Sequence, residues 1–266
     1  MTHSSPRKVA LVTGASSGIG AVYADRLAAR GYDLILVARR ADRLDALCAQ
    51  VSKAHGIEAE AVVADLTSDA DLARVETILS TRADVRVLVN NAGMARLGPV
   101  AQQSAGDALS QIALNIIALT RLTQAVVPAF IAKNEGVIIN IASVLGIHAL
   151  PISAVYSGTK AFVLQYSRAL QEELAGTGVK VQLVLPASTA TEIWDLAGVP
   201  LAALNKDALM TTEHMVDAAL AGWDQGEAVT WPSVADATLW ETYEAARSAL
   251  FAATQVGKPA PRYQVA

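Results

Sequence analysis

The chain of 266 residues holds a single cysteine, Cys48, inside the helical pattern "ADRLDALCAQV". That position predicts a small buried residue and not a nucleophile. The start, "MTHSSPRKVALVTG", is a short polar lead followed at once by a strand-like run, without the apolar core and cleavage site of a signal peptide. One cysteine and no recognisable export signal make the cytoplasm the expected compartment.

Charges and aromatic residues are also few. Charged residues make up 17% of the chain and the net charge is -4, which gives no electrostatic reason to expect nucleic acid or an anionic membrane as a partner. No apolar run approaches the length needed to cross a bilayer, and no metal site is expected. Hydrophobic residues make up 53%, with aromatics only 5%, so small aliphatic side chains dominate. This composition favours parallel strands that helices cover on both faces.

Short β-branched runs alternate with longer helical patterns along the chain. Strands separated by helices of ten or more residues indicate right-handed βαβ units and a parallel sheet. No linker or change of composition interrupts the pattern, which predicts one domain over residues 1–266. The expected strands are 8–14, 33–39, 58–65, 85–93, 136–143, 179–186 and 227–233, and the main expected helices are 20–31, 41–56, 68–82, 106–133, 153–176 and 234–253.

The alternation fails after Pro186. Residues 187–212 contain only two short helical patterns and follow directly on a strand end, where we expect a substrate-binding loop. A Pro-containing tail at 254–266 ends the chain.

A glycine-rich turn, "TGASSGIG" (13–20), joins the first strand to the first helix. Gly14 would free the turn, Gly18 would let a ligand approach the backbone, and Gly20 would allow the helix to pack closely on the sheet. Such a turn brings backbone N–H groups and a helix N-terminus to a diphosphate. Alone it could be a plain strand-to-helix turn, but its place in a βαβ frame indicates a nucleotide site.

The end of the second strand, "VARR", bears on the choice of cofactor. An NAD site usually carries an acid there for the ribose hydroxyls, and Ala38 stands in its place. Arg39 and Arg40 follow, and a guanidinium group would pair with a 2′-phosphate. The sequence therefore predicts NADP(H) in preference to NAD(H), the alternative being that the arginines are a solvated helix start.

In "AVYSGTKAF" (154–162), Tyr156 and Lys160 stand one helical turn apart and so share one face. They could be a packed aromatic and a solvated charge. Together with the glycine turn, "DL" (65–66), "NNAG" (90–93), Asn115 and Ser143, they make the chain resemble the short-chain dehydrogenase/reductase family from about residue 8 to 191. The resemblance implies a Rossmann-type, doubly wound parallel sheet of about seven strands, and a homodimer or homotetramer.

The same resemblance implies a role for each matching position. Asn115, Ser143, Tyr156 and Lys160 would form the catalytic tetrad. One position departs from the family: Ala187 stands where Gly usually follows the sixth-strand proline, which puts the path of the adjoining loop in question. The implied cofactor-binding residues are Gly14, Ser16, Ser17, Ile19, Arg39, Arg40, Asp65, Leu66, Asn91, Ala92, Gly93, Tyr156, Lys160, Thr189 and Thr191.

The tetrad suggests how a carbonyl would be reduced. A free tyrosine has a pKa of about 10, and a neighbouring Lys160 ammonium should lower that value toward working pH. Tyr156 would then protonate the carbonyl oxygen, Ser143 would hydrogen-bond it, and Asn115 would hold a water that returns the proton. Each of these residues alone could have a purely structural role. The presence of all four in this order argues against that alternative.

The substrate is expected to be apolar. The candidate pocket walls carry no cation, so we expect a ketone or secondary alcohol with an aliphatic or aromatic body. The sequence thus predicts an NADP(H)-dependent carbonyl reductase, reversible as an alcohol dehydrogenase. A non-catalytic dinucleotide sensor and a reductase of carrier-linked 3-oxoacyl groups are the alternatives. The candidate walls are Met94, Leu145, Ile147, Leu150, Ile193, Trp194 and Leu196.

Overall fold

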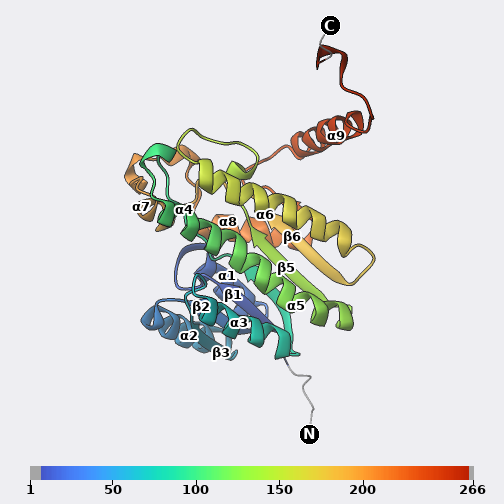
Figure 1. The fold of residues 1–266 in the computed structure, drawn as a ribbon. Coiled ribbons are helices and arrows are strands. Elements are labelled where there is room, and N and C mark those ends of the chain that lie inside the picture. Colours follow the sequence, from blue (N-terminus) through green and yellow to red (C-terminus); the bar gives the residue numbers. More distant parts are fainter. Residues whose placement is uncertain (1–6, 264–266) are drawn as a thin grey trace. The chain divides into compact units, whose positions relative to one another are not determined.

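A computed structural model describes residues 7–263 (Figure 1). Residues 1–6 and 264–266 lie outside this part, and with them most of the polar lead and the end of the predicted tail. The chain divides into two compact units, Met1–Pro232 and Ser233–Ala266. The sheet and its covering helices belong to the first unit, so the prediction of one domain over 1–266 stays a prediction where Ser233–Ala266 is concerned.

The first unit is built on a parallel sheet of seven strands in the order β3-β2-β1-β4-β5-β6-β7. The predicted sheet is therefore confirmed. The order reverses between β1 and β4, and in such sheets ligands bind at that switch point, beyond the carboxyl ends of the strands. The strands are β1 (Val9–Thr13), β2 (Asp33–Ala38), β3 (Ala59–Val63), β4 (Val85–Asn90), β5 (Gly136–Ile141), β6 (Val179–Val184) and β7 (Val229–Thr230).

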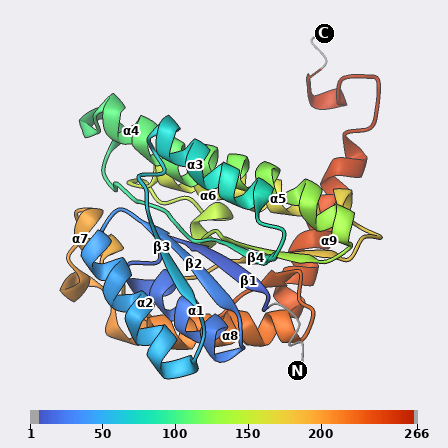
Figure 2. The same ribbon diagram turned by 90° about the horizontal axis from the view of Figure 1, so that it is seen from below.

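Helices cover both faces of the sheet (Figure 2). Successive side chains of a strand point to opposite faces, so Ala10 and Val12 of β1 join one core and Val9 and Leu11 join the other. The first core is closed by α1 (Gly18–Ala29), α2 (Ala41–His55) and α8 (Thr212–Asp224). The second is closed by α3 (Asp69–Thr81), α5 (Leu119–Lys133) and α6 (Ala154–Glu173).

The predicted long helix near 106–133 has an irregular middle. It comprises α4 (Ala105–Ile112), a π-helical segment η2 (Ala113–Ala118) and α5. By length and composition alone, Ala105–Lys133 is long and apolar enough to cross a membrane, so the expectation that no run reaches that length was wrong. A helix that covers a sheet meets the same criterion, and here Leu122, Val126 and Phe130 are buried in the second core.

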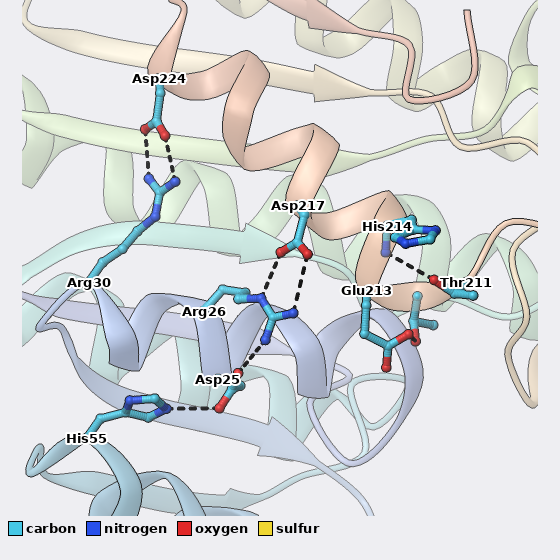
Figure 3. A network of polar contacts seen from close by, with 10 residues as sticks. Asp25, Arg26, Arg30, His55, Thr211, Glu213, His214, Asp217 and Asp224 are labelled. Atoms are coloured by element: carbon cyan, nitrogen blue, oxygen red, sulfur yellow. Dashed lines mark hydrogen bonds and ion pairs between the residues drawn. The ribbon is translucent and has the colours of Figure 1, made fainter.

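Charged side chains tie α1 to α8 (Figure 3). Arg30 forms a bidentate pair with Asp224, at 2.8 and 2.7 Å. One turn earlier Arg26 bridges Asp217 and Asp25, and Asp25 also bonds His55 Nε2 at 2.9 Å. These pairs hold α1 against α8 near the C-terminal end of α1.

The sequence predicts two short helical patterns in the segment between β6 and α8, and the structure has three short helical elements there. A four-residue helix, α7 (Ile193–Leu196), is followed by two 3-10 turns, η4 (Leu201–Ala203) and η5 (Lys206–Ala208). A parallel bridge pairs Thr189 with Met210, so both ends of the segment are held together.

The second unit contains α9 (Thr238–Ala253) and the 3-10 turn η6 (Pro261–Tyr263). Asp236 starts α9 by accepting from the backbone N–H and hydroxyl of Thr238. No residue of α9 is buried, and Leu239, Tyr243, Leu250 and Phe251 are exposed.

Candidate active site

The glycine-rich turn leaves β1 and enters α1 at the switch point. Gly14 and Gly18 have φ angles of 66° and 56°, which favour glycine. A Cβ on Gly20 would lie 2.4 Å from the carbonyl oxygen of Gly14, so the helix packs tightly on the turn. The N-cap residue Ser17 makes no side-chain cap bond to α1, which leaves the first N–H groups of that helix free to meet a phosphate.

Thr13 joins this turn to the loop after β4. Its hydroxyl donates to the carbonyl of Val89 at 3.1 Å and accepts from the backbone N–H groups of Asn91 and Ala92, both at 3.0 Å. A Cβ on Gly93 would lie 3.4 Å from Asn115 Oδ1 and 3.6 Å from Lys160 Nζ. The predicted residues Asn91, Ala92 and Gly93 therefore run from the glycine turn to the tetrad.

The "DL" pair follows β3 at the same edge of the sheet. Leu66 is buried. Asp65 turns the chain: its Oδ1 accepts from the backbone N–H and hydroxyl of Thr67 at 2.9 and 2.7 Å, and its own N–H donates to Asp71. One carboxylate oxygen of Asp65 is thus used to shape the turn beside Leu66.

The two arginines after β2 differ in their surroundings. Arg39 is exposed, and its guanidinium makes no hydrogen bond or ion pair within residues 7–263. Arg40 donates to the hydroxyls of Ser16 and Ser17, at 2.9 and 2.7 Å, and to Glu192 Oε2 at 2.8 Å. The predicted cation that is free to meet a ligand is therefore Arg39, while Arg40 is already engaged.

Lys160 is buried beneath the site. Its ammonium donates to the carbonyl oxygen of Ile141, the last residue of β5, at 2.8 Å, and lies 5.7 Å from the ring centre of Tyr156. Burial lowers the pKa of Lys160 to about 8, because a charged amine is poorly solvated there. The side chain is thus fixed by the sheet and directed at the tyrosine.

The pKa of Tyr156 departs from the sequence prediction. Burial raises this pKa to about 12, and a hydrogen bond with the Ser143 hydroxyl lowers it only in part. The expected lowering of this pKa by Lys160 was wrong, because desolvation of the phenolate is the largest effect on Tyr156. Ser143 follows β5, where its hydroxyl also accepts from the N–H of Leu145 at 3.1 Å.

Asn115 lies in the π-helical segment and is buried. Its amide nitrogen donates to the carbonyl of Met94 at 2.9 Å and to Thr159 Oγ1 at 3.0 Å, and its Oδ1 accepts from the N–H of Met94 at 2.9 Å. These bonds clamp the Met94 backbone to α6, beside Tyr156. The second lone pair of Oδ1 is the position left on this side chain for the predicted water.

The loop after β6 approaches the glycine turn. Ala187, which replaces the family's glycine, does not adopt a left-handed backbone; among the described residues other than glycine, only Asn134 has a positive φ. Thr191 comes close to α1, since a Cβ on Gly18 would lie 3.2 Å from its methyl group. Thr189 is buried, and its hydroxyl donates to the Ala187 carbonyl at 3.2 Å.

Two backbone hydrogen bonds join the segments that carry the candidate substrate-binding residues. The N–H of Leu97 donates to Ala197 and that of Gly98 donates to Ile152. Among the candidates, Ile147 and Leu150 are each 43% exposed and Leu196 is 54% exposed, so this end of the sheet presents apolar side chains to solvent. Met94, Leu145, Ile193 and Trp194 are partly buried.

Several residues of the site were missed by the sequence analysis. Thr13 and Thr159 act through hydrogen bonds to residues far away in the sequence, so no local pattern marks them. Arg43 and Glu192 are joined at 2.7 Å across 149 positions. Their only sequence signal is their nearness to predicted cofactor residues, Arg40 and Thr191.

Solved structures resemble the whole chain closely. A short-chain dehydrogenase from Sphingobium yanoikuyae in complex with NADPH is 46% identical, with a TM-score of 0.93 over 96% of this chain and 100% of that one. The bulky-bulky ketone specific alcohol dehydrogenase from Comamonas testosteroni is 39% identical, with a TM-score of 0.89 over 98% and 100%.

Curated relatives match a shorter region. The very-long-chain 3-oxoacyl-CoA reductase of Bos taurus is 35% identical over 188 residues, which are 69% of this chain and 60% of that protein. The chain thus spans less than two thirds of the length of this relative. The model of the family described as short chain dehydrogenase matches residues 8–198, more than half of the chain. The chain therefore belongs to the short-chain dehydrogenase family of oxidoreductases, which sets aside the non-catalytic sensor.

Proposed function

We propose that the protein is an NADP(H)-dependent carbonyl reductase, reversible as a secondary alcohol dehydrogenase, that acts on bulky apolar ketones. The observation that carries the proposal is the meeting of Ser143, Tyr156 and a buried Lys160 at the sheet edge, beside the glycine turn. The NADPH complex and the ketone specificity of the two similar structures support it.

The residues present fit a nicotinamide dinucleotide. The left-handed Gly14 and Gly18 and the uncapped N-terminus of α1 suit a diphosphate, and the exposed Arg39 suits a 2′-phosphate. When bound, the cofactor supplies or accepts the hydride. The residues proposed to hold it are Gly14, Ser16, Ser17, Ile19, Arg39, Arg40, Asp65, Leu66, Asn91, Ala92, Gly93, Tyr156, Lys160, Thr189 and Thr191.

The chain's own residues supply orientation and a proton. The Ser143 hydroxyl and the Tyr156 phenol would hydrogen-bond the same carbonyl oxygen, which fixes the substrate. Tyr156 gives that oxygen its proton as the alcohol forms, and Lys160 stabilises the phenolate that is left. Asn115 keeps the Met94 backbone against α6, so the residues around the carbonyl stay in place.

The apolar residues around the site favour a bulky substrate. Ile147, Leu150 and Leu196 are exposed, and covering them with an apolar substrate would remove their side chains from water. None of the candidate substrate residues carries a charge, so they offer no partner to a phosphorylated substrate.

Tyr156→Phe tests the proposal. This variant keeps the ring but removes the proton donor, so we expect turnover of a diaryl ketone with NADPH to fall by about 10²–10⁴-fold. Binding of NADPH, followed by fluorescence, should persist. Tyr166→Phe on the same helix is the control and should keep its turnover. Near-normal rates in Tyr156→Phe would contradict the proposed role.

The curated relatives favour a second candidate, a 3-oxoacyl thioester. This substrate is also a ketone with an apolar tail, so the same tetrad could reduce it. Comparing kcat/KM for a diaryl ketone with that for a long-chain 3-oxoacyl-CoA separates the two candidates. Comparing kcat/KM for NADPH with that for NADH tests the choice of cofactor. A higher kcat/KM for the acyl-CoA would favour the second candidate, and a strong preference for NADH would refute the role of Arg39.

A further inference from the structure

Glu192 joins the substrate-binding loop to the basic end of the predicted cofactor site. Its carboxylate accepts from Arg43 at 2.7 Å, from Arg40 at 2.8 Å and from the Ser17 hydroxyl at 3.2 Å. We call Glu192, Arg40 and Arg43 the clasp. The two arginines belong to the start of α2 and the glutamate to the loop after β6, so the clasp spans elements about 150 residues apart in the sequence.

In the clasp, Glu192 engages two guanidinium groups that could otherwise bind a 2′-phosphate. Arg40 also donates to Ser16 and Ser17, so in the clasp its guanidinium faces both the glycine turn and the carboxylate. Of the three arginines at this end of β2, only Arg39 lacks a partner within residues 7–263. Arg40 and Arg43 each point Nη1 at Glu192, so a phosphate that takes both of these donors must replace the carboxylate.

The carboxylate competes as a charge at all working pH values. The Arg43 and Arg40 guanidiniums lower the pKa of Glu192 to about 2, so protonation does not release it near neutrality. A second anion at the same guanidinium groups is what can release it. Glu192 directly follows Thr191, which lies against Gly18, so the clasp is one of the contacts that hold the start of the substrate-binding loop. The bridge between Thr189 and Met210 is another, and it does not involve Glu192.

We infer that Glu192 is a specificity-determining and positioning residue: it competes with the 2′-phosphate of NADP(H) for Arg40 and Arg43, and it lets go of the loop when that phosphate binds. A cofactor without a 2′-phosphate leaves the clasp closed. The inference rests on the proposed NADP preference. Through Glu192, the cofactor that is bound would determine how freely residues 187–212 move.

Calorimetry with two cofactor fragments tests the competition. Adenosine 2′,5′-bisphosphate carries the 2′-phosphate and adenosine 5′-monophosphate does not. In Glu192→Gln the bisphosphate should bind about fivefold more tightly at low salt, because a surface ion pair no longer opposes it. The affinity for the monophosphate should stay the same. When Arg43→Gln is already present, adding Glu192→Gln should raise the affinity for the bisphosphate by less, because Arg43 is no longer there for the carboxylate and the phosphate to compete for.

Asp224→Asn is the matched control, because it removes a bidentate surface ion pair with Arg30 elsewhere in the same unit. It should change neither affinity. Weaker binding of both fragments in Glu192→Gln would overturn the competition, because it would mean that the clasp closes over a bound cofactor. If the unchanged protein binds both fragments equally, the proposed NADP preference is wrong. The competition by Glu192 is then tested separately, by whether Glu192→Gln produces a preference for the bisphosphate.

Hydrogen exchange gives the second readout. Without ligand, amides of residues 188–193 should exchange faster in Glu192→Gln than in the unchanged protein. The bisphosphate should produce the same acceleration in the unchanged protein, and the monophosphate should not. Slower exchange with the bisphosphate would overturn the release of the loop.

Discussion

At the scale of single residues, burial acts in opposite directions on the two groups that would handle the proton. It raises the pKa of Tyr156 to about 12 and lowers that of Lys160 to about 8. Withdrawal of water favours the neutral form of each group, which is the protonated phenol and the deprotonated amine. Near neutrality Tyr156 therefore keeps its proton and most Lys160 side chains remain charged, which is the state that reduction of a ketone requires.

The pKa of Lys160 predicts opposite trends in activity and stability. Reduction of a ketone should lose activity above a pH of about 8, where Lys160 becomes neutral and no longer stabilises the phenolate. The folded pKa lies below the ordinary value of 10.5, so the unfolded chain binds more protons between the two values, and the contribution of Lys160 to stability rises with pH there.

Ketone reduction and urea unfolding measured over the same pH range check both trends. In Lys160→Met the contribution of this residue to the pH dependence of stability should disappear. Activity that rises through pH 8, or a stability slope that Lys160→Met leaves unchanged, would contradict this assignment of the pKa.

At the scale of elements, a buried polar chain holds the second half of the sheet to its helices. Asn90 in β4 donates to Thr123 in α5 at 3.0 Å and to Asn140 in β5 at 2.9 Å. Asn140 donates in turn to Ser167 in α6 at 2.9 Å. All four side chains are buried, so each bond replaces one that water would otherwise make. These bonds hold the carboxyl ends of β4 and β5, which lead into the candidate catalytic loops, against α5 and α6.

Asn140→Leu should be strongly destabilising. The change keeps the branched shape of the side chain but removes one partner each of Asn90 and Ser167, at about 1–3 kcal/mol for each buried donor or acceptor left without a bond. Asn90 keeps its bond to Thr123, and Ser167 keeps its bond to Val163. Urea unfolding should show a lower midpoint with an unchanged slope. Asn205→Ala, which removes an exposed side-chain bond at the start of η5, is the control. A loss of stability no larger than that of the control would show that the buried chain contributes little.

Most elements could be predicted from the sequence, because β-branched runs and helical spacing record burial locally. The π-helical segment could not, since its apolar residues continue the pattern of α4 and α5 and only the local hydrogen bonding differs. The four residues of the predicted tetrad could be picked out from ordered motifs, and their catalytic roles stay a prediction. The raised pKa of Tyr156 and the clasp could not, because burial and pairing over more than a hundred residues exist only in the folded chain.

At the scale of the whole molecule, all seven strands and every candidate catalytic residue lie before residue 233. The segment Ser233–Ala266 adds a helix without buried residues. The homodimer or homotetramer stays a prediction. Exposed apolar residues on Ala105–Lys133 and on α6, among them Leu109, Ile117, Ile131 and Phe162, are where we expect two copies to meet.

Removing residues 233–266 should leave a folded protein. The sheet and both cores remain whole, so circular dichroism should lose only the helical signal of α9 and thermal unfolding should stay cooperative. Ending the chain after Gly226 is the control: it also removes β7 and the Thr230 hydroxyl that accepts from Gln182 at 2.9 Å, and it should destabilise the fold. An unfolded chain ending at Pro232 would show that the second unit is needed for folding.

The reversal of strand order between β1 and β4 divides the chain at one point into two sets of duties. The arginines that would select the cofactor lie before β4, and the four candidate catalytic residues lie after it. A chimera joined within β4 could therefore exchange the cofactor specificity of two family members while keeping the chemistry of one. Glu192 lies after β4 but pairs with Arg40 and Arg43, which lie before it. The residue at position 192 in such a chimera would therefore have to suit the arginines of the other parent.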